Sequence, residues 1–330
     1  MRAIVVPRLG GPEVLTLREV PQPTQAVGEV LVKIKYAGIT FGDVYQREGT
    51  YRGGKPLLAT DQPLPIGGEA GGTVAAVGPG VTHVAVGDTV VYAETLGSYA
   101  EYASVPGWRV MKVPAGLALR DAVAVYSLGL TAHYLAHDTG KLKPGMSCLV
   151  HAAAGGVGHL LVQFAKKAGA SVVATVGSKE KADFVQSLGA DKIILYRDTP
   201  FLQEVKTWGD GKGVDVAYDA LGKATLDDSI KATRVRGLCV LYGNTTGLVE
   251  TVAPMDLAAA GSIFFTRPRL NHHTRTREEI AKRVDDLFGG LKDGSLKVAV
   301  NSVLPLAEAA ESHRLLESRA TIGKVLLEAS

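Results

Sequence analysis

The segment that decides the fold is SCLVHAAAGGVGHL, residues 147–160. It opens with a short apolar run that is typical of a buried parallel strand. A turn of small residues follows, and then Val157, Leu160 and Phe164 recur at steps of three and four, which predicts one buried face of a helix. Free amides at the start of such a helix suit an anionic group such as a dinucleotide pyrophosphate. A glycine-rich turn alone is weak support, but a strand, a turn, a helix and a second strand in this order predict a dinucleotide fold.

The composition places the chain among ordinary globular proteins. Its 330 residues, 46% of them hydrophobic and 21% charged, suffice for two domains with a sizeable core. The formal net charge is only +3 and the basic residues are dispersed, which argues against a nucleic-acid or membrane partner. The cysteines, Cys148 and Cys239, lie in apolar strand-like runs and are expected to fill the core. Residues 1–6 are typical of a first strand rather than a signal peptide, and no apolar run reaches bilayer length, so we expect a cytoplasmic protein.

The first third of the chain has the pattern of a compact, partly barrel-like domain, with short strands separated by Gly, Pro and Asp turns. The strands expected there are residues 29–37, 71–77 and 89–94. The pattern changes near residue 121, where helix-forming sequence through residues 126–137 leads to a Lys-Pro-Gly turn at 143–145.

From residue 147 the chain alternates between strands and helices, which predicts a parallel, doubly wound sheet. The further strands expected are 171–176, 192–196, 214–220 and 238–243, and the helices are 179–188, 201–208 and 225–232. The tail is expected to contain helices at 277–291 and 306–316 and strands at 297–300 and 324–327. The predicted fold class is therefore α/β, with a nucleotide domain inserted into a second domain that both ends of the chain build.

Six motifs, in order along nearly the whole chain, resemble the zinc-free, ζ-crystallin-like quinone oxidoreductases of the medium-chain dehydrogenase/reductase superfamily. They are GGPEVL at 10–15, FGDVY at 41–45, AAAGGVG at 152–158, YGN at 242–244, TRP at 266–268 and ESRAT at 317–321. The resemblance implies a GroES-like β-rich catalytic domain, residues 1–125 and 268–330, and a Rossmann NADPH-binding domain, residues 126–267. It also implies a homodimer, with NADPH in the cleft between the two domains.

One position departs from the family pattern. The family often has Asn immediately before the position of Phe41, whereas this chain has Thr40. Threonine has a hydroxyl but lacks the amide of asparagine. We therefore expect this change to affect how the substrate is oriented near the nicotinamide.

The end of the second strand of the nucleotide domain distinguishes NADP from NAD. NAD enzymes place an acidic residue there, which binds the ribose hydroxyls. This chain instead has Gly177 and Ser178, followed by Lys179 and Lys181. Two alternatives remain open: the lysines could form a solvated first helical turn, and Glu180 could accept a ribose hydroxyl.

A 2′-phosphate would suit the side chains that follow this strand. Ser178, Lys181 and Tyr196 supply a hydroxyl, a positive charge and a phenol, and Arg197 is close in sequence. The resemblance supports Lys181 and Tyr196, whereas proximity alone supports Arg197. We therefore favour NADPH as the cofactor.

A zinc site is not expected. Zinc-dependent relatives have a Cys at the position of Thr40 and a His at the position of Gly68, and this chain has lost both ligands. A catalytic zinc needs about three protein ligands and a structural zinc about four. Several histidines have no cysteine or carboxylate at a recognisable spacing and are interpreted as surface or core residues: His133, His137, His272 and His273.

Without a metal or a nucleophile, the chemistry must come from the cofactor, which the protein holds against an electron-poor acceptor. Tyr45 and Tyr51 are the candidates for lining the position of the acceptor, with Thr40 and Asp43 beside them. The alternative for both tyrosines is a purely structural packing role.

The remaining cofactor contacts follow from the resemblance. They are expected to face the nicotinamide, the pyrophosphate, the adenosine phosphate and the carboxamide in turn, and most fall at strand ends. The positions are Phe41, Gly42, Asp43, Val44, Tyr45, Gly155, Gly156, Val157, Gly177, Ser178, Lys181, Tyr196, Tyr242, Gly243, Asn244, Thr245, Thr266, Arg267, Pro268 and Arg319.

Two classes of function follow from these observations. The first is an NADPH-dependent quinone reductase, with reduction of the C=C bond of enones or similar alkenes as a close variant. The second is a non-catalytic NADPH-binding or RNA-binding protein, against which the dispersed charge and the lack of an aromatic and basic stripe argue. The expected partner is a small quinone or activated alkene.

Overall fold

The computed structural model describes residues 1–50 and 64–329, and these divide into two compact units. The first unit comprises Met1–Ser127 and Thr274–Ser330, and the second comprises Leu128–His273. Each unit has a hydrophobic core of its own. The first core includes Ile34, Val90 and Leu327, and the second includes Leu149 and Val173.

Six parallel strands form the sheet of the second unit. They are β9 (Ser147–Val150), β10 (Ser171–Val176), β11 (Lys192–Leu195), β12 (Val214–Asp219), β13 (Thr233–Leu241) and β14 (Phe264–Thr266). Their order across the sheet is β11-β10-β9-β12-β13-β14. From β9 the chain adds strands toward one edge as far as β11 and then, starting with β12 on the other side of β9, toward the opposite edge, as in doubly wound dinucleotide-binding folds. The predicted doubly wound parallel sheet is confirmed.

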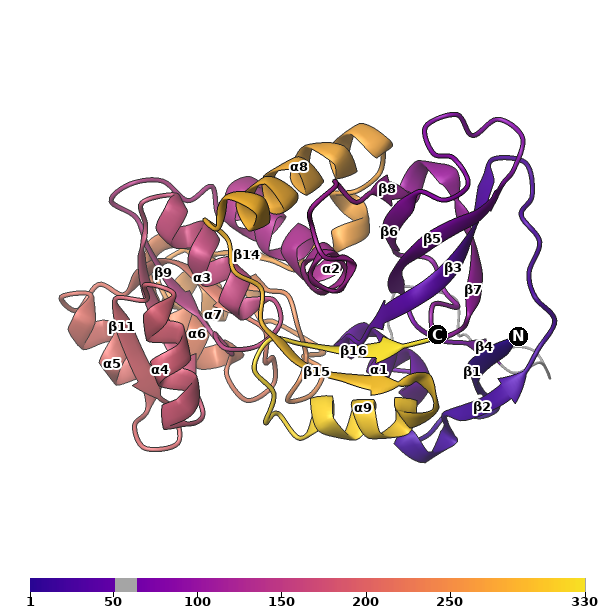
Figure 1. Cartoon of the computed structure of the whole chain (residues 1–330). Coiled ribbons are helices and arrows are strands. Elements are labelled where there is room, and N and C mark those ends of the chain that lie inside the picture. The colour runs from indigo at the N-terminus through magenta and orange to yellow at the C-terminus, as the bar shows by residue number, and fades with distance from the viewer. Residues whose placement is uncertain (51–63, 330) are drawn as a thin grey trace. The chain divides into compact units, whose positions relative to one another are not determined.

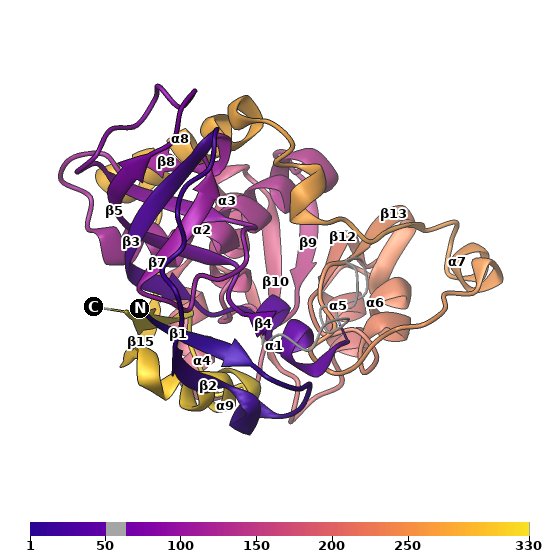
Figure 2. The same cartoon turned by 90° about the vertical axis from the view of Figure 1, so that its right-hand side faces the viewer.

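Helices follow the strands of this sheet along the chain. They are α3 (Gly158–Lys167), α4 (Lys179–Ser187), α5 (Phe201–Trp208), α6 (Leu226–Ala232), α7 (Pro254–Ala259) and the short η4 (Leu270–His272). Helices α3 and α4 contact β9, β10 and β11, whereas α5 and α6 contact each other and the strands from β11 to β13. Figure 1 shows β11 between α4 and α5, and Figure 2 shows α6 beside β12 and β13. Because the central strands are covered in this way, they consist of buried apolar runs.

The described part of the first unit contains two sheets. The smaller has the order β2-β1-β4, with β1 (Arg2–Val6), β2 (Thr16–Glu19) and β4 (Leu64–Pro65). The larger has the order β15-β16-β3-β5-β6-β8, and β7 pairs with β3. Its strands are β3 (Glu29–Gly38), β5 (Glu69–Val77), β6 (Thr89–Ala93), β7 (Tyr102–Pro106), β8 (Met111–Lys112), β15 (Val300–Pro305) and β16 (Lys324–Glu328).

Helices of the first unit come from both ends of the chain. They are η1 (Pro12–Val14), α1 (Phe41–Glu48), η2 (Gly107–Arg109), α8 (Arg277–Asp293), η5 (Leu306–Glu308) and α9 (Ala309–Glu317). Helix α2 (Leu119–Tyr134) begins in the first unit and ends in the second, where the π-helical turn η3 (Leu135–Thr139) follows it. Helix α9 contacts η1, so the first and last parts of the chain lie side by side (Figures 1 and 2).

Several expected elements differ from the observed ones. The strand expected at 297–300 is wrong: β15 begins at Val300, where intermediate and exposed positions alternate as far as Pro305. Strand β13 begins at Thr233, five residues before the expected start, because Thr233 already pairs with Val214 of β12. Helix α1 was not expected at all, since its short sequence contains a glycine and four charged or amide side chains.

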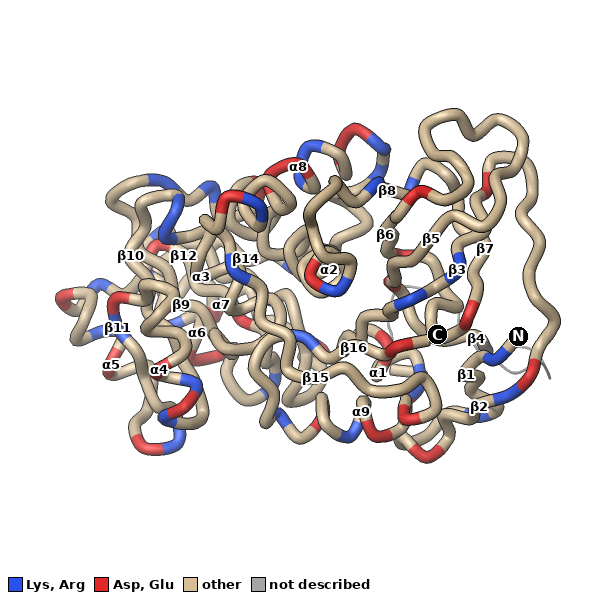
Figure 3. Tube along the Cα trace, in the orientation of Figure 1, with Lys and Arg blue, Asp and Glu red and all other residues tan. Residues whose placement is uncertain are grey.

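Charged side chains of both signs are interspersed along the trace of each unit, as Figure 3 shows. None of the helices within residues 1–50 and 64–329 combines the length and apolar character that a bilayer span requires. Cys148 and Cys239 are both fully buried free thiols, as their apolar sequence context predicts.

Candidate cofactor and active site

The start of α1 carries the residues that the sequence assigns to the nicotinamide end. Thr40 precedes the helix in an extended conformation, and the Asp43 carboxylate accepts hydrogen bonds from both its backbone amide, at 2.7 Å, and its hydroxyl, at 2.9 Å. A Thr followed three residues later by an acidic residue is a helix-start signal. This signal is present in the sequence and could have revealed α1.

Residues 40–45 divide into accessible and buried side chains. Thr40, Phe41, Gly42 and Tyr45 are half-buried, and the rings of Phe41 and Tyr45, one helical turn apart, lie 6.1 Å from each other. Asp43 and Val44 are buried, with exposed fractions of 1% and 3%. Their side chains therefore face the interior of the first unit, and Asp43 contacts the half-buried Thr40 from there. Tyr51 lies outside the described residues.

Asp43 ends a chain of hydrogen bonds that runs through the interior. Its Oδ2 accepts a hydrogen bond from the Tyr99 hydroxyl at 3.2 Å, and Tyr99 in turn contacts Nε2 of His313 at 3.2 Å. Arg47 lies 3.1 Å from Nδ1 of His313. A guanidinium can only donate, so Nδ1 must accept and Nε2 must carry the proton. Burial, assisted by the positive charge of Arg47, lowers the pKa of His313 to about 3, which agrees with a neutral ring.

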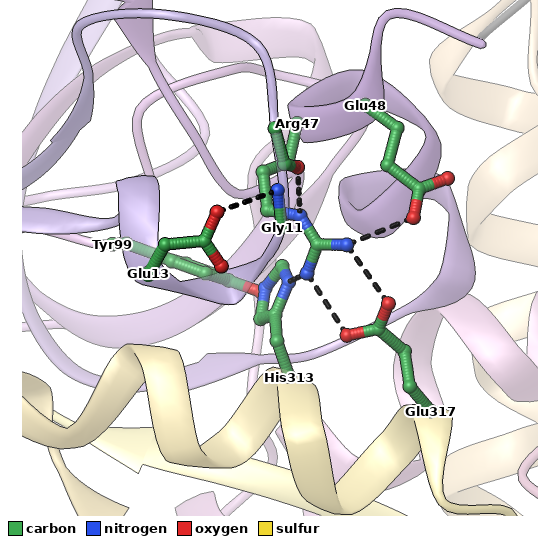
Figure 4. Close-up of polar contacts among 8 residues, drawn as sticks. Gly11, Glu13, Arg47, Glu48, Tyr99, His313 and Glu317 are labelled. Carbon is green, nitrogen blue, oxygen red and sulfur yellow. Dashed lines mark hydrogen bonds and ion pairs between the residues drawn. The ribbon is translucent and has the colours of Figure 1, made fainter.

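Arg47 joins α1 to α9 (Figure 4). Its buried guanidinium makes a two-pronged contact with Glu317, at 2.9 and 2.8 Å, and also bonds Glu48 at 2.9 Å and the carbonyl oxygen of Gly10 at 3.0 Å. Bidentate pairs of this kind fix both partners in orientation as well as in distance. Arg319, which the sequence assigns to the cofactor, lies exposed just after α9 with a left-handed φ of +57°.

A second buried pair lies close to Asp43. The Lys324 ammonium contacts the Glu69 carboxylate, whose other oxygen accepts the backbone amide of Ser127 at 3.1 Å. Burial lowers the pKa of Lys324 and raises the pKa of Asp43, and the Lys324 charge opposes the shift of Asp43. The first unit thus buries a set of charges around the start of α1 that no sequence pattern indicates.

The two positions matched to lost zinc ligands both border Asp43. Thr40 bonds its carboxylate, and a Cβ added at Gly68 would lie 3.7 Å from its Oδ1. Within residues 1–50 and 64–329, no group of three or more His, Cys, Asp or Glu side chains is placed to hold a metal ion.

In the second unit, the turn between β9 and α3 is built by close backbone packing. Ala152 has a left-handed φ of +49°, and its carbonyl oxygen accepts the amide of Gly155 at 2.8 Å. A Cβ added at Gly158 would overlap that carbonyl oxygen and lie 2.8 Å from Cα of Ala153, whereas one at Gly156 would face the Leu128 side chain. The glycine that this turn most needs is therefore Gly158.

The tips of β10 and β11 bring the predicted phosphate residues together. The two strands are paired neighbours, and Gly177 and Tyr196 directly follow them. A Cβ at Gly177 would lie 2.7 Å from the Tyr196 hydroxyl, which shows how closely the phenol covers this glycine. Ser178 caps α4 by accepting the Lys181 amide at 3.3 Å.

Positive charge gathers at these strand tips. Burial, together with the charge of Arg197, lowers the pKa of the half-buried Lys181, and Glu180 has the opposite effect. Lys179 instead points to an exposed ion pair with Asp183 at 3.1 Å. A hydroxyl, a phenol and two neighbouring cations form a donor set that fits a phosphate monoester.

The other predicted contacts follow β13 and β14. Tyr242 donates its amide to the Asp219 carbonyl at 2.8 Å, and Gly243 packs so closely on Ala220 that a Cβ would overlap its carbonyl oxygen. Asn244 and Thr245 continue this loop half-buried, and Thr266, Arg267 and Pro268 end β14 and follow it. All predicted residues of the second unit thus lie at the carboxyl ends of its parallel strands, where such folds bind ligands.

Comparison with known proteins defines the class of this molecule. The family described as alcohol dehydrogenase GroES-like domain matches residues 26–115, and the family described as zinc-binding dehydrogenase matches residues 156–289. The first confirms the predicted GroES-like part, and the second covers most of the Rossmann sheet. The fold is that of the medium-chain dehydrogenases and reductases.

Individual relatives narrow this class. The chain is 39% identical over 321 residues to quinone oxidoreductase 1 of Escherichia coli (strain K12), with 96% of each chain covered. It is 39% identical over 329 residues to a 2-haloacrylate reductase of a Burkholderia species, with 98% of each covered. The structure of the Escherichia coli quinone oxidoreductase complexed with NADPH matches with a TM-score of 0.94 and 37% identity, covering 99% of this chain and 100% of that one. This chain belongs to the quinone oxidoreductase family of the medium-chain dehydrogenase/reductase superfamily.

Proposed function

We propose that this protein is an NADPH-dependent quinone reductase that works without a metal. The observation that supports the cofactor is the group of Ser178, Lys181, Tyr196 and Arg197 at the tips of β10 and β11, with no carboxylate at the tip of β10 itself. Membership of the family supports an oxidoreductase reaction, and the relative solved with NADPH supports the same cofactor.

The assignment of site residues is part of this proposal. Residues 1–125 and 268–330 would form the catalytic domain and residues 126–267 the NADPH-binding domain. Thr40, Phe41, Gly42 and Tyr45, with Tyr51, would meet the nicotinamide and the acceptor, and Asp43 and Val44 would support them from within. The remaining contacts run from the pyrophosphate to the tail of the chain: Gly155, Gly156, Val157, Gly177, Ser178, Lys181, Tyr196, Tyr242, Gly243, Asn244, Thr245, Thr266, Arg267, Pro268 and Arg319.

Bound NADPH supplies a hydride, which with one proton converts a quinone into a hydroquinone. The chain's own task is to orient the acceptor and to provide a hydrogen-bond donor for the oxygen that gains charge. Thr40 donates its hydroxyl hydrogen to Asp43, so its oxygen faces other partners only as an acceptor. We therefore assign the donor role to the Tyr45 hydroxyl.

The change Tyr45→Phe tests this assignment. It keeps the ring beside Phe41 and removes only the hydroxyl, so NADPH affinity should stay within about twofold. Loss of one donor should slow turnover by roughly one to two decades, which corresponds to about 1–3 kcal/mol. Steady-state kinetics and fluorescence titration measure both quantities, with Tyr102→Phe on β7 as the control. Unchanged turnover would remove Tyr45 from the mechanism, and a loss of many decades would make it an obligatory proton donor.

Cofactor choice gives a second test. NADPH should bind at least about tenfold more tightly than NADH, a difference of about 1.4 kcal/mol. Lys181→Glu should shrink this gap, because it replaces a cation beside Arg197 with a carboxylate. Lys179→Glu, two residues away on an exposed side chain that pairs with Asp183, should leave most of the gap in place. Equal affinities of the unmodified protein for NADPH and NADH would refute the assignment.

Reduction of an activated alkene is the second candidate function. The 2-haloacrylate reductase is as similar to this chain as the quinone oxidoreductase is, at 39% identity each. A panel of quinones, enones and 2-haloacrylates, followed by NADPH absorbance with and without a chelator, separates the candidates. We expect quinones to be reduced fastest and the chelator to have no effect. Turnover of alkenes alone would favour the second candidate, and NADPH binding without any turnover would favour a non-catalytic role.

We also propose a homodimer. Strand β14 is an edge of the parallel sheet and presents Phe264, which is 65% exposed. Val235 on the neighbouring β13 is equally exposed, and Met255 on α7 is 74% exposed. Exposed apolar side chains beside an unpaired strand edge favour association with a second sheet.

Light scattering tests the dimer. The unmodified protein should have twice the mass of one chain, and Phe264→Lys should shift it toward the monomer. Leu96→Lys, which changes a 40% exposed leucine of the first unit, should leave the mass unchanged. A monomeric unmodified protein would contradict this proposal.

A further inference from the structure

A buried polar network lies beneath the carboxyl edge of the sheet in the second unit. His151 directly follows β9, Thr175 belongs to β10, Asp219 ends β12 and Ser229 lies on α6. All four have exposed fractions of 1% or less. The His151 ring contacts the Thr175 hydroxyl at 2.8 Å through Nδ1 and the Ser229 hydroxyl at 3.0 Å through Nε2. Ser229 donates to Oδ2 of Asp219 at 2.7 Å.

The direction of each hydrogen bond in this network can be assigned by starting from the Asp219 carboxylate. The Asp219 carboxylate accepts, so the Ser229 hydroxyl spends its hydrogen there and must accept from Nε2–H of His151. Burial lowers the pKa of His151, against the opposing effect of the Asp219 charge, and so favours a neutral ring. In a neutral ring that carries its proton on Nε2, Nδ1 accepts from the Thr175 hydroxyl. Phe201 closes one side of the ring edge-on, at 4.6 Å between centroids.

Asp219 extends the network to the loops that follow β12 and β13. Its Oδ1 accepts the amides of Leu221 and Gly222, at 2.8 and 2.9 Å, which fixes the loop after β12. A Cβ at Gly222 would lie 2.8 Å from the Gly247 carbonyl oxygen, so this loop packs directly on the loop that carries Asn244. Thr225 also bonds both carboxylate oxygens, at 3.0 and 2.8 Å.

Backbone bonds connect the same strands to the glycine turn. The amide of His151 bonds the carbonyl oxygen of Tyr218 at 3.1 Å, and the amide of Ala153 bonds that of Thr175 at 3.2 Å. One imidazole and one carboxylate thus join the ends of β9, β10 and β12, and through the loop packing that of β13. These are the loops that carry Gly155, Gly177 and Asn244.

We propose that His151 is a positioning residue for cofactor binding, which holds the four loops in their binding arrangement through Thr175, Ser229 and Asp219. This inference rests on the proposed NADPH function. His151 is buried and acts through its partners rather than on the cofactor itself. If the loops are already ordered in the free protein, NADPH binding does not lose free energy in ordering them. The affinity for NADPH therefore depends on the network that keeps the loops ordered. A buried network with one member removed leaves unsatisfied donors and acceptors and loses more than a single bond.

The experiment compares two Ser-to-Ala changes at opposite ends of one sheet. Ser229→Ala cuts the network at the carboxyl end, between His151 and Asp219. Ser147→Ala removes an analogous serine–aspartate contact at the amino end, where Ser147 bonds Asp215 at 3.1 Å. Three quantities are measured for both proteins: the NADPH affinity by fluorescence titration, the thermal midpoint without ligand, and the turnover at saturating NADPH.

We expect Ser229→Ala to weaken NADPH binding at least about tenfold, while turnover at saturating NADPH stays within about twofold. Both variants should lower the thermal midpoint by a similar amount, but Ser147→Ala should change the NADPH affinity by less than twofold. His151→Phe should reproduce the loss of affinity, and His151→Gln, which can still donate to Ser229, should recover part of it. If His151→Phe does not fold, the comparison of Ser229→Ala with Ser147→Ala is sufficient to test the proposal.

Equal affinities for Ser229→Ala and the unmodified protein, with a lowered thermal midpoint, would overturn the proposal, because the network would then only stabilise the fold. A different result marks failure of the proposed function: an unmodified protein that binds neither NADPH nor NADH. That result would refute both the proposed function and the positioning role of His151.

Discussion

Gly158→Ala should reduce NADPH affinity by at least about a hundredfold, or about 2.8 kcal/mol. The added Cβ would overlap the Ala152 carbonyl oxygen and press on Cα of Ala153, and both of these atoms belong to the backbone. A side chain can rotate away from such a contact, but this turn can relieve it only by separating from α3. The turn carries Gly155 and Gly156, so their amides would move away from the position that we propose for the pyrophosphate. We expect overpacking to cost about 1–3 kcal/mol of stability as well.

A matched glycine in α8 provides the control. Gly289 has no atom within 4 Å of an added Cβ, so Gly289→Ala should leave NADPH affinity unchanged and stabilise the helix by roughly 0.5–1 kcal/mol. Gly155→Ala is a milder change of the same turn, since its Cβ would lie 3.1 Å from the Ala152 oxygen. It keeps the test usable if Gly158→Ala does not fold. Unchanged affinity in a folded Gly158→Ala protein would show that the tight turn does not support cofactor binding.

Glu317→Gln should have a large effect on stability. The Arg47 guanidinium is fully buried and Glu317 is its bidentate partner, whereas Glu48 makes only one contact. Glutamine keeps one acceptor but no charge, which leaves a buried cation poorly compensated. We expect a loss of about 2–3 kcal/mol, less than for a fully enclosed pair because Glu317 is partly exposed.

The thermal midpoint measures this loss, which should amount to about 3–4 °C. Glu311→Gln is the control on the same helix, because Glu311 pairs with Arg314 at 3.2 Å while both side chains are more than half exposed. An exposed pair of this kind contributes little, so its midpoint should hardly change. If both variants unfold at the same temperature, the contact between α1 and α9 carries no special stability.

The parallel sheet could be predicted because its strands are buried on both sides. Strands such as β9 and β10 are uninterrupted apolar runs between helices, and a pattern of this kind depends only on neighbouring residues. The tips of these strands then place the predicted cofactor residues at one edge. Sequence order alone therefore sufficed for the fold of the second unit, and it placed the proposed cofactor residues at one edge of the sheet.

Helix α1 and strand β15 were harder to predict for local reasons. Eight residues with one glycine give too short a pattern for a helical period, and only the Thr40 and Asp43 pair marks the start. Strand β15 has an alternation of intermediate and exposed positions rather than a buried run. Its pairing with β16, more than twenty residues later, decides where it lies.

The buried networks could not be predicted because their members are distant in sequence. Arg47 and Glu317 are 270 residues apart, and His151 and Ser229 are 78 residues apart. His151 lies within the segment that decided the fold, but nothing in a single sequence indicates which hydroxyl its ring will meet. Such contacts arise only when the strands of the sheet have taken their places.

The central claim is that this chain uses NADPH to reduce quinones. The most direct measurement is the ratio of kcat/KM for NADPH to that for NADH, with one saturating quinone, in the unmodified protein and in Lys181→Glu. We expect a ratio of at least about ten in the unmodified protein and a clearly lower ratio in Lys181→Glu. A ratio near one in the unmodified protein, or no oxidation of either cofactor by any quinone, would contradict it.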